Sequence, residues 1–166
     1  MRHLLFICLL AAPLLPVLSA PLTRDSIPAH LQGLPLPDFK LELPDGSAFY
    51  TDNLPKNKPV VIILFSPDCD HCREQTRELV DQIHRLRQVQ LVMATVLPHD
   101  KMKAFYQEFG IGKHRNIVMG RDPLFFFSRY FQSHYIPFTA VYNKKRELVA
   151  TFDGGVKMEQ LLGQLQ

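Results

Sequence analysis

The sequence predicts an α/β domain in which a central mixed β-sheet is flanked by helices. Three consecutive segments carry this prediction: an unbroken apolar run over 60–65, an amphipathic helical pattern over about 69–87, and a second apolar run over 91–97. A continuous apolar run of this length is typical of a strand buried on both faces, as central strands of α/β sheets are. Strand, helix and strand in this order form a βαβ unit with a right-handed crossover.

Size and composition indicate one globular domain. The chain has 166 residues, of which 46% are hydrophobic and 21% charged, enough for a substantial core. Its 19 lysines and arginines nearly balance its 16 acidic residues, for a net charge of +3. Because this charge is small, we expect no nucleic-acid partner.

Residues 1–20 have the pattern of a secretory signal peptide. A basic start precedes an uncharged apolar stretch over 4–18, and small residues close the segment near Ser19. Pro13 and Pro16 interrupt the apolar stretch, which is shorter than the roughly 20 residues that a membrane span needs. We therefore expect a periplasmic or otherwise extracytoplasmic protein that meets a membrane only if this segment is retained.

Residues 21–37 form a proline-rich lead-in, and residues 38–166 form the domain itself. The domain is expected to begin with a β-hairpin, because 39–43 alternates with period two, turn-forming residues follow, and 48–50 can return as a second strand.

Further elements follow the βαβ unit. We expect a helix capped by Asp100 and ended by Gly110, a short strand over 117–119, and a helix that opens at Pro123 and runs to Gln132. The chain should then close with a hairpin and a last amphipathic helix, over 138–142, 147–152 and 156–165. The helix expected over 123–132 carries an aromatic cluster: Phe125, Phe126, Phe127, Tyr130 and Phe131. This cluster should lie mostly in the core, with room for one exposed apolar patch.

Two cysteines, Cys69 and Cys72, remain once the signal peptide and Cys8 are removed. A disulfide between them would close a very short loop and stabilise the fold little. The pair is therefore better explained by a chemical role than by a structural one. The helix N-terminus that follows the buried strand presents free N–H groups and a partial positive charge to Cys69. Cys69 is therefore the expected nucleophile, and Cys72, one turn into the helix, resolves the mixed disulfide.

The two residues between the cysteines should adjust the redox potential of the pair. His71 could add positive charge that stabilises the reduced form, whereas Asp70 acts in the opposite direction. The sequence does not decide which of the two effects is larger, so the direction of electron flow stays open.

These features resemble the thioredoxin superfamily, and most closely its TlpA-like extracytoplasmic thiol–disulfide oxidoreductases. The resemblance covers residues 38–166 and rests on an ordered series of motifs: Asp38-Phe39, Asp45-Gly46, Lys58-Pro59-Val60-Val61, Phe65 through Cys72, Ile136-Pro137-Phe138 and Gly154. It implies a thioredoxin fold with a strand–helix insertion between residues 96 and 135.

The resemblance also implies how the site works. Pro137 would be a cis proline beside the dithiol, and the backbone of Ile136 would bind an extended substrate chain. No cofactor is implied, because the dithiol itself carries two electrons. The partners would be protein thiols or disulfides and a separate redox partner.

The sequence departs from the superfamily pattern at positions that matter for proton transfer. Asp68 replaces the tryptophan usual before the first cysteine, and no carboxylate occurs within 60–65. Gln75 stands where many TlpA-like proteins have a glutamate, and Glu74 would point about 100° away around the helix.

Three alternatives compete with the oxidoreductase. A copper-binding protein would use Cys69 and Cys72 with His71 or His134. A thiol peroxidase would use Ser66 and Arg121 around Cys69, although the proline expected before such a motif is missing. A non-catalytic interaction module would leave the dithiol inert.

Overall fold

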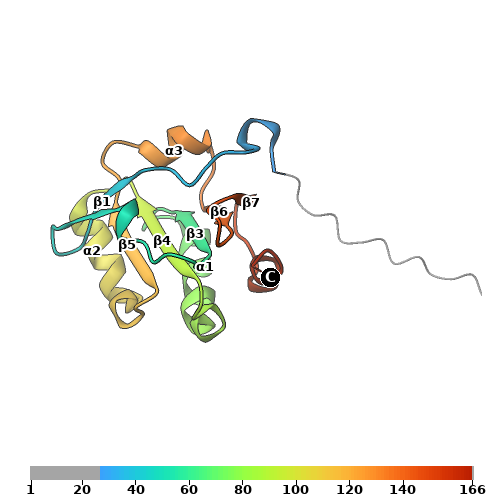
Figure 1. Ribbon diagram of the computed structural model, residues 1–166. Helices are drawn as coiled ribbons and strands as arrows, with labels where there is room; N and C mark the ends of the chain where they lie inside the picture. The colour runs from blue at the N-terminus through green and yellow to red at the C-terminus, as the bar shows by residue number, and fades with distance from the viewer. Residues whose placement is uncertain (1–26, 166) are drawn as a thin grey trace, which may run out of the picture.

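The computed structural model describes residues 27–165, which form a seven-stranded mixed sheet of order β2-β1-β5-β4-β3-β6-β7 (Figure 1). The strands are β1 Lys40–Glu42, β2 Ala48–Tyr50, β3 Val60–Leu64, β4 Gln90–Thr95, β5 Ile117–Arg121, β6 Phe138–Tyr142 and β7 Leu148–Asp153. Strands β3, β4 and β5 are parallel, as the βαβ unit requires, and β1 and β6 flank them antiparallel. The expected mixed α/β sheet is confirmed.

Helices cover both faces of this sheet (Figure 1). They are α1 Asp70–Asp81, α2 His99–Glu108, α3 Phe126–Phe131 and α4 Met158–Gly163. Helices α1, α2 and α4 pack on one face, whereas α3 and the lead-in pack on the other. The strand–helix insertion comprises α2, β5 and α3, which lie between β4 and β6.

Strand β3 belongs to both cores. Val61 and Ile63 face the layer of α1 and α2, while Val60, Ile62 and Leu64 face the layer of α3, in the alternation that a strand imposes. All five side chains are buried. Its two edges pair with β4 and β6, so the strand is held on every side.

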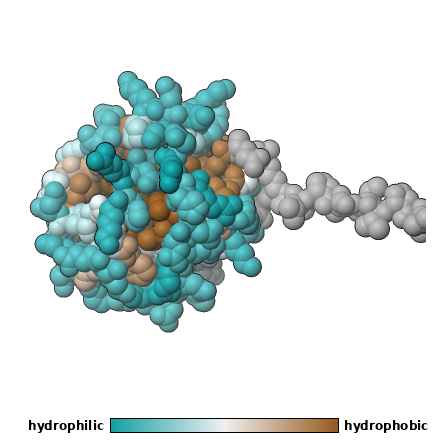
Figure 2. Space-filling view, turned by 90° about the horizontal axis from the view of Figure 1, so that it is seen from below, coloured by the Kyte–Doolittle hydropathy of each residue, from teal (hydrophilic) through white to brown (hydrophobic). Residues whose placement is uncertain are grey.

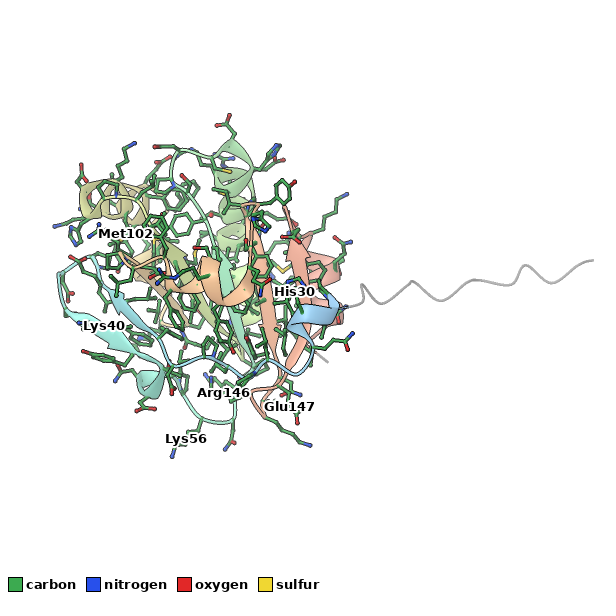
Figure 3. The ribbon with its side chains drawn as sticks, turned by 90° about the horizontal axis from the view of Figure 1, so that it is seen from above. His30, Lys40, Lys56, Met102, Arg146 and Glu147 are labelled. Atoms are coloured by element: carbon green, nitrogen blue, oxygen red, sulfur yellow. The ribbon has the colours of Figure 1, made fainter. Side chains whose placement is uncertain are left out.

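The proposed signal peptide over 1–20 lies outside the described residues, as does the first part of the lead-in. The rest of the lead-in packs on the domain: Leu31 is buried, and the hydroxyl of Tyr130 donates to the carbonyl of Pro35 at 2.7 Å. Pro35 also pairs with Glu147 beside the β6–β7 turn. Figure 3 shows His30 and Glu147 on one side of the molecule and Met102 of α2 on the other.

Two helix boundaries on the dithiol face differ from the expected ones. Helix α1 ends at Asp81, well before residue 87, and a 3₁₀ turn over Ile83–Leu86 continues the apolar pattern and buries Leu86. Helix α2 begins at His99 after Pro98, so Asp100 is not its cap. Asp100 instead lies in the first turn, where a negative charge suits the helix dipole.

The expected helix from Pro123 to Gln132 is shorter at both ends. Phe125 and Gln132 have left-handed backbones, with φ of 54° and 50°, so α3 spans only the residues between them. Within the aromatic cluster, Phe127 and Phe131 are buried, whereas Phe125 is 52% exposed. The cluster is therefore mostly core with one exposed part, as expected.

Viewed from below, the surface is mainly hydrophilic, with hydrophobic residues visible in separate areas (Figure 2). Among residues 27–165, no helix combines the length and apolar character needed to cross a membrane.

Gly120 gives a test of the contact between β5 and β1. A Cβ at this position would lie 2.8 Å from Cβ of Leu41 and 3.0 Å from the carbonyl oxygen of Glu42. Gly120→Ala should lower the free energy of unfolding by about 1–3 kcal/mol in urea, because β1 must shift. Gly163→Ala is the matched control, since its Cβ would meet nothing within 4 Å. Equal stability of the two variants would contradict this contact.

Candidate active site

The end of β3 places Cys69 at the start of α1. Phe65 is buried, and the chain then turns through Ser66 and Pro67 so that the N–H of Cys69 donates to the carbonyl of Ser66 at 3.1 Å. Cys69 is the N-cap of α1, with the extended backbone that this position requires. The dithiol therefore lies at the junction of the buried strand and the helix.

The two cysteines have different surroundings. Cys69 is partly exposed, whereas Cys72 is 1% exposed, and both are free thiols. The N–H of Cys72 donates to Sγ of Cys69 at 3.3 Å, so the cap residue's own sulfur accepts one of the free N–H groups of the helix end. The accessible sulfur is thus Cys69, and Cys72 is directly behind it.

Burial raises the pKa of the Cys72 thiol to about 12, and its hydrogen bond with Cys69 adds to the rise. A backbone hydrogen bond from Ser66 acts in the opposite direction without cancelling it. Cys72 is therefore a thiol at neutral pH and must lose its proton before it can attack a disulfide.

Gln75 is the polar residue one turn beyond Cys72, and it is 8% exposed. Its Nε2 donates to the hydroxyl of Thr139 on β6 at 3.3 Å, and its Oε1 accepts from the N–H of Val156 at 3.3 Å. Glu74 is exposed, as its place on the helix predicts. An uncharged amide, satisfied on both sides, therefore occupies the position where many TlpA-like proteins have a carboxylate.

Arg73 is a site residue that sequence reasoning missed. Its guanidinium donates to the carbonyl of Pro67 at 3.3 Å and forms an ion pair with Glu108 of α2. It also stacks 5.4 Å from the ring centre of Phe109. Arg73 thereby ties the turn before Cys69 to α2, a role that no local pattern distinguishes from that of an ordinary surface arginine.

The Ile136–Pro137 peptide bond is cis, as the resemblance implies. Because Phe138 on β6 pairs with Leu64 on β3, Pro137 lies beside the strand end that leads to Cys69. Pro137 is buried and its carbonyl accepts from the N–H of Gly154 at 2.8 Å. Within 27–165, the N–H and C=O of Ile136 have no backbone hydrogen-bond partner, and the side chain is 44% exposed.

The other candidate residues from the sequence lie in different parts of the structure. Asp70 and His71 are exposed in the first turn of α1, beside the dithiol. In the described part of the chain, no three His, Cys, Asp or Glu side chains group as metal ligands, so His71 and His134 do not complete a copper site with the cysteines. Arg121, required by the peroxidase alternative, pairs with Glu42 on the β1 side of β5.

A βαβ unit with a dithiol at the helix N-terminus and a cis proline beside it defines a thioredoxin-fold protein. The profile of the AhpC/TSA family matches residues 33–161, and the chain belongs to this family. No curated protein matches the sequence significantly. The resemblance to the thioredoxin superfamily is thus confirmed, and the TlpA-like subtype stays a prediction.

Solved structures share the fold at low identity. A secreted Mycobacterium tuberculosis disulfide oxidoreductase homologous to E. coli DsbE has a TM-score of 0.64 and 16% identity, covering 76% of this chain and 92% of that one. MTB DsbF has a TM-score of 0.65 and 18% identity, covering 84% and 96%. A thioredoxin-like protein from Aeropyrum pernix has a TM-score of 0.61 and 14% identity, covering 76% and 87%.

The difference between the two thiols can be measured by alkylation of single-cysteine variants. With iodoacetamide at neutral pH, Cys69 in Cys72→Ser should react at least about tenfold faster than Cys72 in Cys69→Ser, because alkylation needs an accessible thiolate. Burial, the larger cause of the raised pKa, persists in the second variant. Its rate should therefore keep rising with pH through about pH 10. A plateau near neutral pH would contradict the burial of Cys72.

Gln75→Glu tests the neutral character of the buried position. The substitution removes the Nε2 donor of Gln75 and places a carboxylate where water cannot hydrate it. The variant should therefore be about 1–3 kcal/mol less stable at neutral pH. Burial would raise the folded-state pKa of the new carboxyl, so the variant's stability should fall as pH rises through that pKa. Glu74→Gln, the reverse exchange at an exposed neighbour, should change stability by less than about 0.5 kcal/mol. Denaturant unfolding across pH 4–8 measures both, and equal effects would refute the assignment.

Proposed function

We propose that this protein is an exported thiol–disulfide oxidoreductase that exchanges the Cys69–Cys72 dithiol or disulfide with cysteines of other proteins. The observation that carries the proposal is the pairing of an accessible thiol at a helix N-terminus with a buried thiol one turn further on. An accessible sulfur can form a mixed disulfide, and a buried neighbour can then resolve it. Membership of the AhpC/TSA family supports the same chemistry.

In the direction of reduction, the Cys69 thiolate attacks one sulfur of a substrate disulfide. The substrate S–S bond breaks, a mixed disulfide forms, and the leaving sulfur takes up the proton that Cys69 released. Cys72 then attacks Sγ of Cys69, and the second substrate thiol leaves with the Cys72 proton. Two electrons have passed from the dithiol to the substrate, and oxidation of a substrate is the same sequence reversed.

Ile136 and Pro137 form the substrate-binding part of this proposal. An extended substrate chain beside Cys69 needs hydrogen-bond partners, and the unpaired N–H and C=O of Ile136 offer them at the right strand end. Pro137 has no N–H to compete for those partners. The substrates are therefore proteins with an extended, accessible cysteine segment, and a separate redox partner returns the dithiol to its starting state.

Asp70 and His71 are proposed to set the redox potential, because both are charged or chargeable side chains in the first turn of α1. A potential of the wild-type pair near about −270 mV would mark an electron donor, and one near about −120 mV an oxidant. The potential of His71→Asn, equilibrated against glutathione buffers, tests the role of His71: a value below that of the wild type supports it, and an unchanged value contradicts it.

Export rests on the apolar segment within 1–20 and is supported by a structural relative described as secreted. After release of the signal peptide, the domain would act on substrates outside the cytoplasm. Mass spectrometry of the mature protein from the producing cell tests this directly, because a retained residue 1 would rule out cleavage.

The reaction itself is tested with insulin as the disulfide substrate. The wild-type protein should reduce insulin with dithiothreitol as electron source, Cys69→Ser should lose all of this activity, and Cys72→Ser should accumulate a mixed disulfide through Cys69. Tyr50→Ser, an exposed change on β2, is the matched control and should retain full activity. A folded wild-type protein without activity above the dithiothreitol background would favour the non-catalytic module.

A further inference from the structure

Exposed apolar side chains gather in the connection between β5 and β6. In the described part of the chain, five large hydrophobic residues are exposed, and four belong to this connection: Leu124, Phe125, Tyr135 and Ile136, at 71%, 52%, 70% and 44%. The fifth, Tyr50, lies on the edge strand β2. The four therefore form a local feature and are not the scattered exposure that any surface shows.

A cavity of about 350 Å³ opens beside these residues. Its walls include Phe125, Tyr135 and Ile136 from the connection, Ser66 after β3, and Val96 and Leu97 after β4. This volume is roughly ten times the share of one water in the liquid, so it has room for a large side chain. Among the described residues, its titratable wall residues are Asp122, His134 and Tyr135, and no lysine or arginine lines it. The cavity therefore suits an apolar group better than an anion.

Phe125 occupies a backbone position that favours glycine. Its φ of 54° and ψ of 34° are left-handed, a conformation that is unfavourable for any residue with a Cβ. The surroundings hold it there, because the Asp122 carboxylate accepts from the N–H of Phe127 at 2.9 Å and the Ser128 hydroxyl donates to the Phe125 carbonyl at 3.3 Å. The half-exposed ring gains little from packing, so neither backbone conformation nor core stability explains a phenylalanine here.

The cavity adjoins the candidate active site. Ser66 lines it, and the same residue's carbonyl is hydrogen-bonded to the N–H of Cys69. Ile136 lines it as well and directly precedes the cis proline. A polypeptide that pairs with Ile136 while its cysteine reaches Cys69 therefore has the mouth of the cavity beside it. Since an extended chain advances about 3.3–3.6 Å per residue, a neighbour about one to three positions from that cysteine can reach it.

We propose that this cavity is a specificity pocket that binds one aromatic side chain near the reacting cysteine of the substrate protein. The inference rests on the proposed oxidoreductase function and adds the feature that the enzyme recognises in its substrates. Phe125, Phe127 and Tyr135 provide ring surfaces for aromatic contacts. Ile136 aligns the substrate backbone, and the pocket selects the side chain.

Binding can be tested apart from the chemistry, because the protein contains no tryptophan. A glycine–serine peptide with one serine in place of cysteine and one tryptophan about two positions away is added to the Cys69→Ser/Cys72→Ser protein. The tryptophan emission should shift to the blue and saturate, since all of it arises from the peptide. Phe125→Gly, which suits the left-handed backbone, should weaken binding at least about fivefold, and Tyr50→Ser should leave it unchanged. An emission that the protein does not change would refute the pocket, even if the oxidoreductase chemistry is found.

Selectivity is tested with the active protein and mixed disulfides of cysteine peptides with thionitrobenzoate. The wild-type rate should be roughly tenfold or more higher for the tryptophan peptide than for its serine counterpart. Phe125→Gly and Tyr135→Ser should lose most of this ratio, and Tyr50→Ser should keep it. A ratio near one in the wild-type protein, or a ratio that both pocket variants preserve, would overturn the proposal. Failure of the wild-type protein to react with free dithionitrobenzoate would instead refute the oxidoreductase function on which it rests.

Discussion

Strand β3 is buried on both faces and paired on both edges, and the position of every candidate functional group depends on it. Its carboxyl end cannot move without disturbing two core layers and two neighbouring strands. Cys69 follows this end through a short turn, and Pro137 comes from the antiparallel neighbour, one residue before the partner of Leu64. A rigid strand thus brings together two segments that are far apart in the sequence.

The polar groups on the buried side of the dithiol differ from those on its exposed side, where Asp70 and His71 lie. Cys72 is a buried thiol whose pKa is raised by burial, and the polar group behind it is the neutral amide of Gln75. The Gln75 amide is hydrogen-bonded to the Thr139 hydroxyl and to the N–H of Val156. It therefore holds α1 against β6 and the loop before α4. In the proposed reaction the proton of Cys72 passes to the departing substrate thiol, since the amide of Gln75 does not act as a base as a carboxylate would.

Segments from both faces of the sheet contribute residues to the candidate site and the cavity beside it. Helix α1 packs on one face of the sheet and α3 on the other (Figure 1). The cysteines belong to the first layer, and the exposed apolar side chains of the β5–β6 connection flank α3 in the second. They meet at the carboxyl ends of the parallel strands, the edge at which ligands of open α/β sheets bind. In the proposed function, the reacting sulfur atoms and the apolar pocket therefore belong to different segments of the chain.

Local patterns in the sequence determined the βαβ unit and the place of the dithiol. An unbroken apolar run and a period of three to four residues are direct consequences of burial and helical geometry, so they can be read without knowing the fold. The two hairpins and the mostly buried aromatic cluster followed from similar patterns. The bounds of α3 did not follow from the sequence. Phe125 and Gln132 adopt left-handed backbones, which their side chains do not favour.

Only the tertiary structure decided which residues surround the dithiol. The contacts of Arg73 with Pro67 and Glu108, and those of Gln75 with Thr139, join segments separated by a few to more than sixty positions. The cavity between Phe125, Ser66 and Val96 likewise exists because the segments that follow β5, β3 and β4 meet at one sheet edge. Such contacts depend on packing across the whole domain, whereas periodicity and capping depend on the nearest neighbours along the chain.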